Sequence, residues 1–75
     1  MSIIQSVVFN KSFGSIYKMS QWLIENGFDN IKYDIKANTV RWRQYDPILL
    51  KKKGYNKYYT KQLKGGLIDL IIAKI

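Results

Sequence analysis

The alternation of apolar and polar residues changes its period along the chain, and each period predicts a different element. Residues 3–9 combine Ile, Val and Phe in a largely apolar run, which predicts a strand buried on much of both faces. A turn is expected at residues 11–14. Residues 67–75 form a second such run, interrupted only by Asp69 and Lys74, and predict the last strand.

A helical period lies between the first strand and the middle of the chain. Its apolar stripe consists of Ile16, Met19 and Leu23. Ser12 or Ser15 can cap the start of the helix, because a hydroxyl oxygen can accept a hydrogen bond from a free backbone amide. Gly27 supplies a left-handed ending, and Phe28 is placed to pack back on the last turn. We therefore expect an amphipathic helix over about residues 15–26.

Two alternating segments on either side of Ala37-Asn38 predict a β-hairpin. A two-residue turn at this point places Tyr33 opposite Trp42 on an apolar face. The same register places Asp34 opposite Arg41 on a charged face. A four-residue loop would keep the same alternation, so the pattern predicts the faces more firmly than the turn.

Residues 48–66 show no clear period. They are basic, rich in tyrosine and interrupted by glycine, and we interpret them as a long loop with room for one short strand or helical turn. The expected order is strand, helix, strand, strand, loop, strand. This order predicts a single α+β domain over residues 1–75, with one helix packed on a small, mainly antiparallel sheet. Trp22 and Trp42 are expected to be largely buried.

The size of the chain favours support from a second copy. A domain of 75 residues buries a small core, and without Cys or His it has neither a disulfide nor the usual zinc ligands. The first and last strands also carry more apolar surface than one helix can cover. We therefore expect a homodimer through residues 3–9 and 67–75, unless residues 48–66 fold back over the exposed face.

Charge is segregated along the chain. The formal net charge of +8 lies entirely between residues 31 and 64, where ten Lys or Arg residues outnumber two Asp residues. This segregation favours a polyanionic partner, because charge that serves solubility alone is usually dispersed. The residues expected to bind nucleic acid are Lys32, Lys36, Arg41, Arg43, Lys51, Lys52, Lys53, Lys57, Lys61 and Lys64. Tyr55, Tyr58 and Tyr59 could stack on exposed bases, or two of them could instead pack on the sheet.

The most specific local pattern is Arg41-Trp42-Arg43-Gln44. On a strand, its two arginines project to one face while the tryptophan points into the core. A guanidinium group is planar and can grip a phosphate through two donors. Lys32 and Lys36 of the preceding strand join the arginines on the same face. The lysine run at residues 51–53 is instead a mobile tip, suited to phosphate attraction rather than to base recognition.

Catalysis is not indicated by any group of residues. The usual general base and thiol nucleophile are missing without His and Cys, and the five acidic residues are scattered. We therefore expect a non-enzymatic protein with no catalytic residue, metal, cofactor or small-molecule substrate. A membrane is also not an expected partner, because the chain has no basic amphipathic helix.

The order of these features resembles a group of small α+β proteins and domains from phages and giant double-stranded DNA viruses, including Marseillevirus-type ones. The resemblance is carried by Trp22-Leu23, Asn26-Gly27, Arg41-Trp42-Arg43-Gln44, Pro47 and Gly65-Gly66-Leu67-Ile68. It implies a compact α+β unit and a viral setting in which a basic protein could package or organise a genome.

Together, the residues and the resemblance lead to one expected function and one alternative. We expect a small, largely sequence-independent DNA-binding protein, with DNA favoured over RNA as its partner. The alternative is a structural or adaptor protein whose basic face docks an acidic protein. The chain shows no secretory signal and no apolar stretch of membrane-spanning length, so we expect a soluble, intracellular protein, in the host nucleus or cytoplasm or packaged in a virion.

Overall fold

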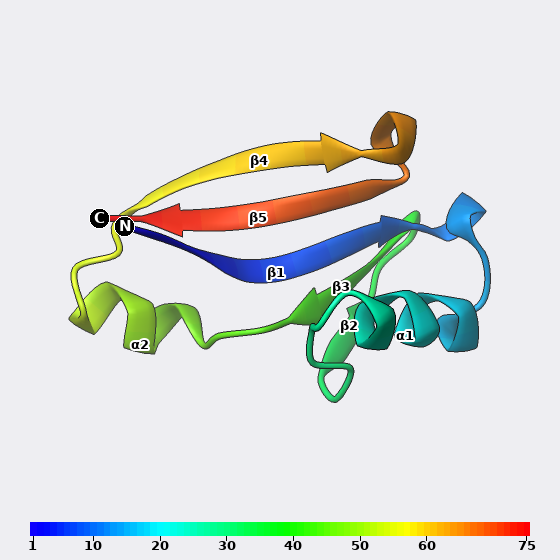
Figure 1. The fold of residues 1–75 in the computed structure, drawn as a ribbon, viewed down its shortest axis with the longest axis horizontal. Coiled ribbons are helices and arrows are strands. Elements are labelled where there is room, and N and C mark those ends of the chain that lie inside the picture. The colour runs from blue at the N-terminus through cyan, green and yellow to red at the C-terminus, as the bar shows by residue number, and fades with distance from the viewer.

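A computed structural model describes all 75 residues of the chain (Figure 1). Its strands are β1 (Ser2–Asn10), β2 (Tyr33–Ile35), β3 (Thr39–Arg43), β4 (Lys57–Leu63) and β5 (Ile68–Lys74). Its α-helices are α1 (Ile16–Glu25) and α2 (Pro47–Lys52). Short 3-10 turns follow β1 at Lys11–Phe13 and β4 at Lys64–Gly66. The expected α+β class is confirmed.

The five strands form one sheet in the order β2-β3-β1-β5-β4, and every neighbouring pair is antiparallel. β1 and β2 therefore run in the same direction, with β3 between them in the opposite direction, and α1 makes the crossover that joins them. β1 and β5, the first and last strands, lie side by side in the middle of the sheet (Figure 1).

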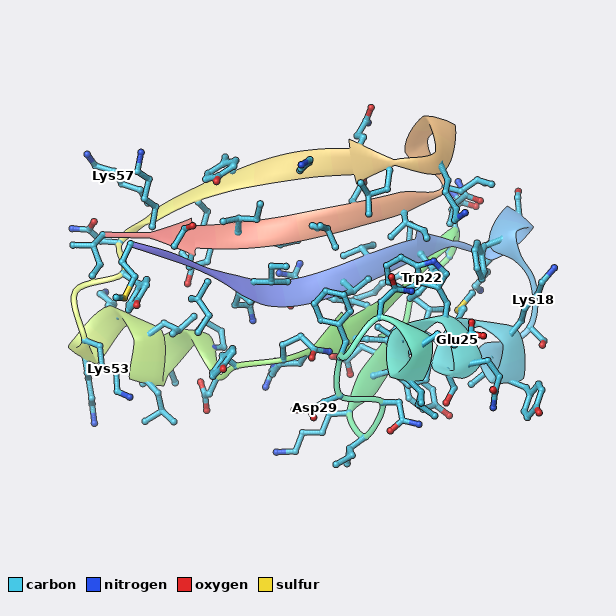
Figure 2. All side chains as sticks on the ribbon, in the orientation of Figure 1. Lys18, Trp22, Glu25, Asp29, Lys53 and Lys57 are labelled. Atoms are coloured by element: carbon cyan, nitrogen blue, oxygen red, sulfur yellow. The ribbon has the colours of Figure 1, made fainter.

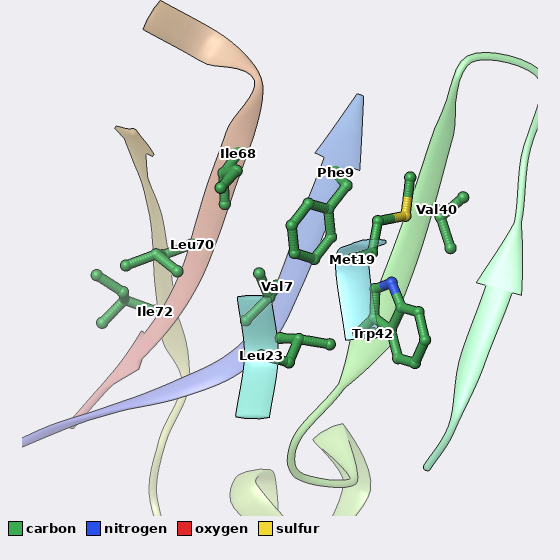
Figure 3. Packing of buried hydrophobic residues seen from close by; sticks show 9 residues of the cluster. All are labelled: Val7, Phe9, Met19, Leu23, Val40, Trp42, Ile68, Leu70 and Ile72. Carbon is green, nitrogen blue, oxygen red and sulfur yellow. The ribbon is translucent and has the colours of Figure 1, made fainter. Parts of the chain in front are cut away.

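The core lies between α1 and one face of the sheet (Figure 3). It consists of nine buried residues: Val7, Phe9, Met19, Leu23, Val40, Trp42, Ile68, Leu70 and Ile72. Trp42 is buried, as expected, whereas Trp22 is only partly buried at the margin of the core. There its ring meets Phe9 edge-on and stacks on Phe28.

Both ends of α1 form as the sequence predicts. The hydroxyl of Ser15 accepts a hydrogen bond from the backbone N–H of Lys18 at 3.2 Å and caps the helix. At the other end, Gly27 has φ of 80°, in the left-handed region, and the N–H of Phe28 donates to the carbonyl of Leu23 at 2.8 Å. This arrangement ends the helix and returns Phe28 to the core.

The hairpin register is also confirmed. Tyr33 lies opposite Trp42 and Asp34 opposite Arg41, and the rings of the first pair are 4.5 Å apart between centroids. The two-residue turn closes with a hydrogen bond from the N–H of Lys36 to the carbonyl of Thr39.

The expectation of a long loop at residues 48–66 is wrong. Asp46 caps α2 by accepting a hydrogen bond from the N–H of Ile48 at 2.9 Å, and Pro47 occupies the first turn, where its missing N–H costs nothing. β4 then pairs with β5 along its whole length. The sheet therefore has five strands, one more than the sequence predicts.

The expected dimer contacts are also placed differently. Residues 3–9 and 67–75 pair mainly with each other, and β3 and β4 flank them on either side. Neither segment provides a long free edge, so two copies cannot pair strand to strand through them. The edges of the sheet are β2 and β4. A homodimer remains a prediction, and pairing between sheet edges would have to use β2 or β4.

Candidate nucleic-acid interface

Three of the expected phosphate-binding cations lie together on the sheet face opposite α1, here called the far face. They are Lys32, Arg41 and Arg43, and we refer to them as the hairpin patch. The two arginines alternate along β3 with core residues, so both project away from the core. Lys32 lies opposite Arg43, because the backbone N–H of Arg43 donates to the carbonyl of Lys32 at 3.0 Å. Opposite residues of a hairpin share a face, so Lys32 lies on the same face as the two arginines. Asp34, opposite Arg41, is the acidic residue within this group.

Arg41 is held in place by two buried polar residues of β1. Its Nε donates to the hydroxyl of Ser6 at 3.2 Å, and its Nη2 donates to Oε1 of Gln5 at 3.0 Å. Ser6 in turn donates to the same Gln5 oxygen at 2.7 Å, and Gln5 donates to the carbonyl of Tyr45 at 2.9 Å. Two of the five guanidinium N–H donors are therefore used internally, which leaves three for a ligand.

A β-bulge makes this arrangement possible. The register between β1 and β5 shifts between Ile4 and Ser6, with Gln5 as the extra residue. Neighbouring residues on a regular strand point to opposite faces, but a bulge redirects one of them. Gln5 and Ser6 can therefore contact each other and the same guanidinium. Sequence reasoning missed both residues, and the polar Gln-Ser pair inside an apolar strand was the available indication.

These contacts predict different stabilities for two matched variants. Arg41→Ala leaves the buried oxygens of Gln5 and Ser6 without their charged donor, whereas no side-chain hydrogen bond is present at Arg43 to be lost. We expect Arg41→Ala to lower the free energy of unfolding by about 1–3 kcal/mol. The matched variant Arg43→Ala should change it by less than about 0.5 kcal/mol. Urea unfolding followed by circular dichroism measures both, and equal losses would contradict the anchoring of Arg41.

A polar hollow of about 240 Å³ lies beside the hairpin patch. It is lined by Asp29, Ile31, Lys32, Arg43, Gln44, Tyr45 and Asp46. The side chain of Gln44 fixes one wall, because its amide accepts from the N–H of Asp29 at 2.8 Å and donates to the carbonyl of the same residue at 2.9 Å. Two carboxylates balance the two cations in this hollow, so it does not have the charge of a phosphate pocket.

The other expected cations lie outside this group of three. Lys51, Lys52 and Lys53 occupy the last turn and C-cap of α2, where cations also complement the partial negative charge of a helix end. Lys57 and Lys61 lie on β4, and the register places them on the same sheet face as α1. Figure 2 shows Lys53 and Lys57 near the end of the molecule where the termini lie. Lys36 lies at the hairpin turn, where it continues the face of the hairpin patch opposite Thr39, and Lys64 lies in the second 3-10 turn.

The structure therefore divides one basic segment of sequence among several surfaces. A rigid, straight duplex on the far face would reach the hairpin patch but not the lysines of β4 on the other face. The hairpin patch is the group of cations that the fold brings together on one face, and it is the candidate interface.

The three tyrosines do not form one stacking platform. Tyr58 and Tyr59 are about half exposed, but as neighbours on β4 they point to opposite faces of the sheet. Tyr55 is partly buried and shares with Tyr58 a mainly apolar hollow of about 300 Å³ beside α2. Tyr55 and Tyr58 therefore lie near each other, and Tyr59 lies apart from them.

Comparisons with known proteins place the chain in no group. No family model, curated protein or solved structure matches it. The resemblance to viral proteins thus remains a prediction from the sequence. Neither α1, with ten residues, nor α2, with six, has the length and apolar character of a helix that crosses a membrane.

Proposed function

We propose that the protein binds nucleic acid through its far face, with contacts to phosphates that depend little on sequence. The observation that carries this proposal is Arg41, an exposed arginine ordered by buried partners beside two further cations. An ordered guanidinium loses less conformational entropy when it binds a phosphate than a freely moving one does. Exposed cations on a sheet face contact the backbone of a duplex rather than the base edges in its grooves.

The nucleic acid we favour is DNA, acting in the packaging or organisation of a viral genome. The sequence resemblance to proteins of double-stranded DNA viruses supports this choice. The excess of positive charge supports it further, because neutralising phosphates releases condensed counterions and drives association.

Salt dependence tests the proposal. If the hairpin patch and Lys36 neutralise about four phosphates, a plot of the logarithm of the binding constant against that of salt concentration should have a slope of about −3 to −4 on duplex DNA. Fluorescence anisotropy with a labelled duplex of mixed sequence, and with a second duplex of different sequence, measures the slope and the sequence dependence.

Two outcomes would contradict the proposal. Absence of binding to duplex DNA at about 50 mM salt would exclude it at ordinary non-specific affinities. Binding that differs more than about a thousandfold between the two duplexes would indicate base recognition. If DNA does not bind but an acidic protein does, the basic face serves the adaptor role instead.

A further inference from the structure

β4 forms a long, unpaired edge of the sheet. It has seven residues, all exposed except the partly buried Leu63, and its ladder with β5 is regular. β2, at the other edge, has three residues. An exposed edge of this length presents a row of backbone donors and acceptors that another strand can pair with.

The register shows which backbone groups of β4 are free. The N–H of Asn10 donates to the carbonyl of Leu67, so residues 67, 69 and 71 direct their backbone groups toward β1. Alternate residues of β5 therefore bond β4, and their partners there are residues 57, 59, 61 and 63. The backbone N–H and C=O groups that point away from the sheet are those of Tyr58, Thr60 and Gln62.

We propose that two copies of the chain pair antiparallel through β4, about a two-fold axis at Thr60. The three outward residues are symmetric about this position. Thr60 then exchanges both backbone hydrogen bonds with Thr60 of the second copy, and Tyr58 does so with Gln62 of the second copy. The result is one continuous antiparallel sheet with ten strands, since each copy contributes five.

The side chains of β4 also suit this register. Lys61 lies opposite Tyr59 of the second copy, where its stem and ammonium group can pack on the ring. Lys57 lies opposite Leu63 of the second copy. Thr60 lies opposite Thr60 of the second copy, and two threonines form a favourable pair on neighbouring strands. An axis at Tyr59 would instead oppose Lys57 and Lys61, two like charges. The axis at Thr60 pairs all seven residues without placing one lysine opposite another.

The strength of this contact should depend on salt. Each copy carries a formal net charge of +8, so two copies repel each other at low ionic strength. Salt screens this repulsion and should strengthen the dimer, whereas it should weaken binding to DNA. The opposite responses separate the two proposals, and dimerisation through β4 does not depend on nucleic-acid binding.

Cysteine cross-linking tests the proposal directly, because the chain has no cysteine of its own. At the axis, two Thr60→Cys residues would lie about 5.5 Å apart between Cα atoms, within the range that a disulfide spans. In the matched variant Gln62→Cys, the two cysteines would lie about 13 Å apart. Non-reducing gels after timed oxidation, at about 0.5 M salt and without nucleic acid, should show covalent dimers of Thr60→Cys forming about tenfold faster or more.

Cross-linking between two different cysteine variants tests the register of this pairing. Tyr58→Cys and Gln62→Cys are each expected to cross-link poorly alone, but a mixture of the two should form the mixed dimer readily. Equal rates for Thr60→Cys and Gln62→Cys would overturn the proposal. So would a wild-type protein that sediments as a monomer, near 8.9 kDa, at every salt concentration while neither pair cross-links preferentially.

Discussion

A Trp42→Ala variant is expected to lose a large part of its stability. Trp42 is 1% exposed, belongs to the central cluster and packs against the ring of Tyr33. Truncating a buried tryptophan costs about 3–5 kcal/mol, because the lost contacts are not fully replaced by collapse of the site. A domain of 75 residues has a total stability of about 4–11 kcal/mol. The variant should therefore unfold at a much lower urea concentration, or be unfolded without urea.

Urea unfolding followed by far-ultraviolet circular dichroism measures this loss. Tyr17→Ala is the matched control, since Tyr17 is an aromatic residue that is 73% exposed on α1, and its loss should cost less than about 0.5 kcal/mol. Trp42→Phe should fall between the two, because it keeps much of the buried ring and removes an indole N–H that has no partner. Equal midpoints for Trp42→Ala and Tyr17→Ala would show that the core is not organised around Trp42.

The second large effect concerns DNA affinity. In the double variant Lys32→Gln/Arg43→Gln, two cations of the hairpin patch are lost while the anchored Arg41 remains. Each lost phosphate contact should weaken binding by roughly tenfold at about 50 mM salt, so the variant should bind about a hundredfold more weakly. Its salt dependence should also become shallower, by about 1.8 in the logarithmic slope.

The control for this variant removes the same charge from another surface. Lys11→Gln/Lys18→Gln takes two cations from the 3-10 turn after β1 and from α1, and both residues are exposed. It should weaken binding by only a few-fold, through the smaller overall field of the protein. If both double variants lose affinity equally, net charge rather than the hairpin patch governs binding.

Local patterns were sufficient to predict α1 and the β2–β3 hairpin. The Ser15 cap, the stripe of Met19 and Leu23, and the Gly27 ending all act within one helix, so the sequence alone contains them. The hairpin alternates clearly because one face packs on the core and the other meets solvent.

The same reasoning failed for α2 and β4. Asp46-Pro47 is a helix start, but Pro47 directly follows the hairpin, where a proline can equally well end a strand. β4 is an edge strand exposed on most positions of both faces, so its residues show no apolar alternation. Its pairing depends on β5, whose position in the sheet no local pattern reveals.

The candidate interface could be predicted only in part. The alternation of β3 placed Arg41 and Arg43 on one face correctly. The partners of Arg41 come from β1, more than thirty residues away, and their orientation follows from a bulge. This arrangement depends on the register between β1 and β5, which no local sequence pattern specifies. The separation of the remaining lysines follows from β4, the strand that the sequence did not predict.

The central position of β1 and β5 has a consequence for how the chain folds. β1 and β5 make more contacts with each other than any other two elements do, and they are the first and last strands of the chain. Their contacts therefore join residues separated by most of the sequence. Closing so large a loop is slow, because the chain loses conformational entropy before the contacts between β1 and β5 form. During synthesis, a chain that has reached only residue 66 still lacks the strand that lies between β1 and β4. The complete five-strand sheet can therefore form only after β5 has been synthesised.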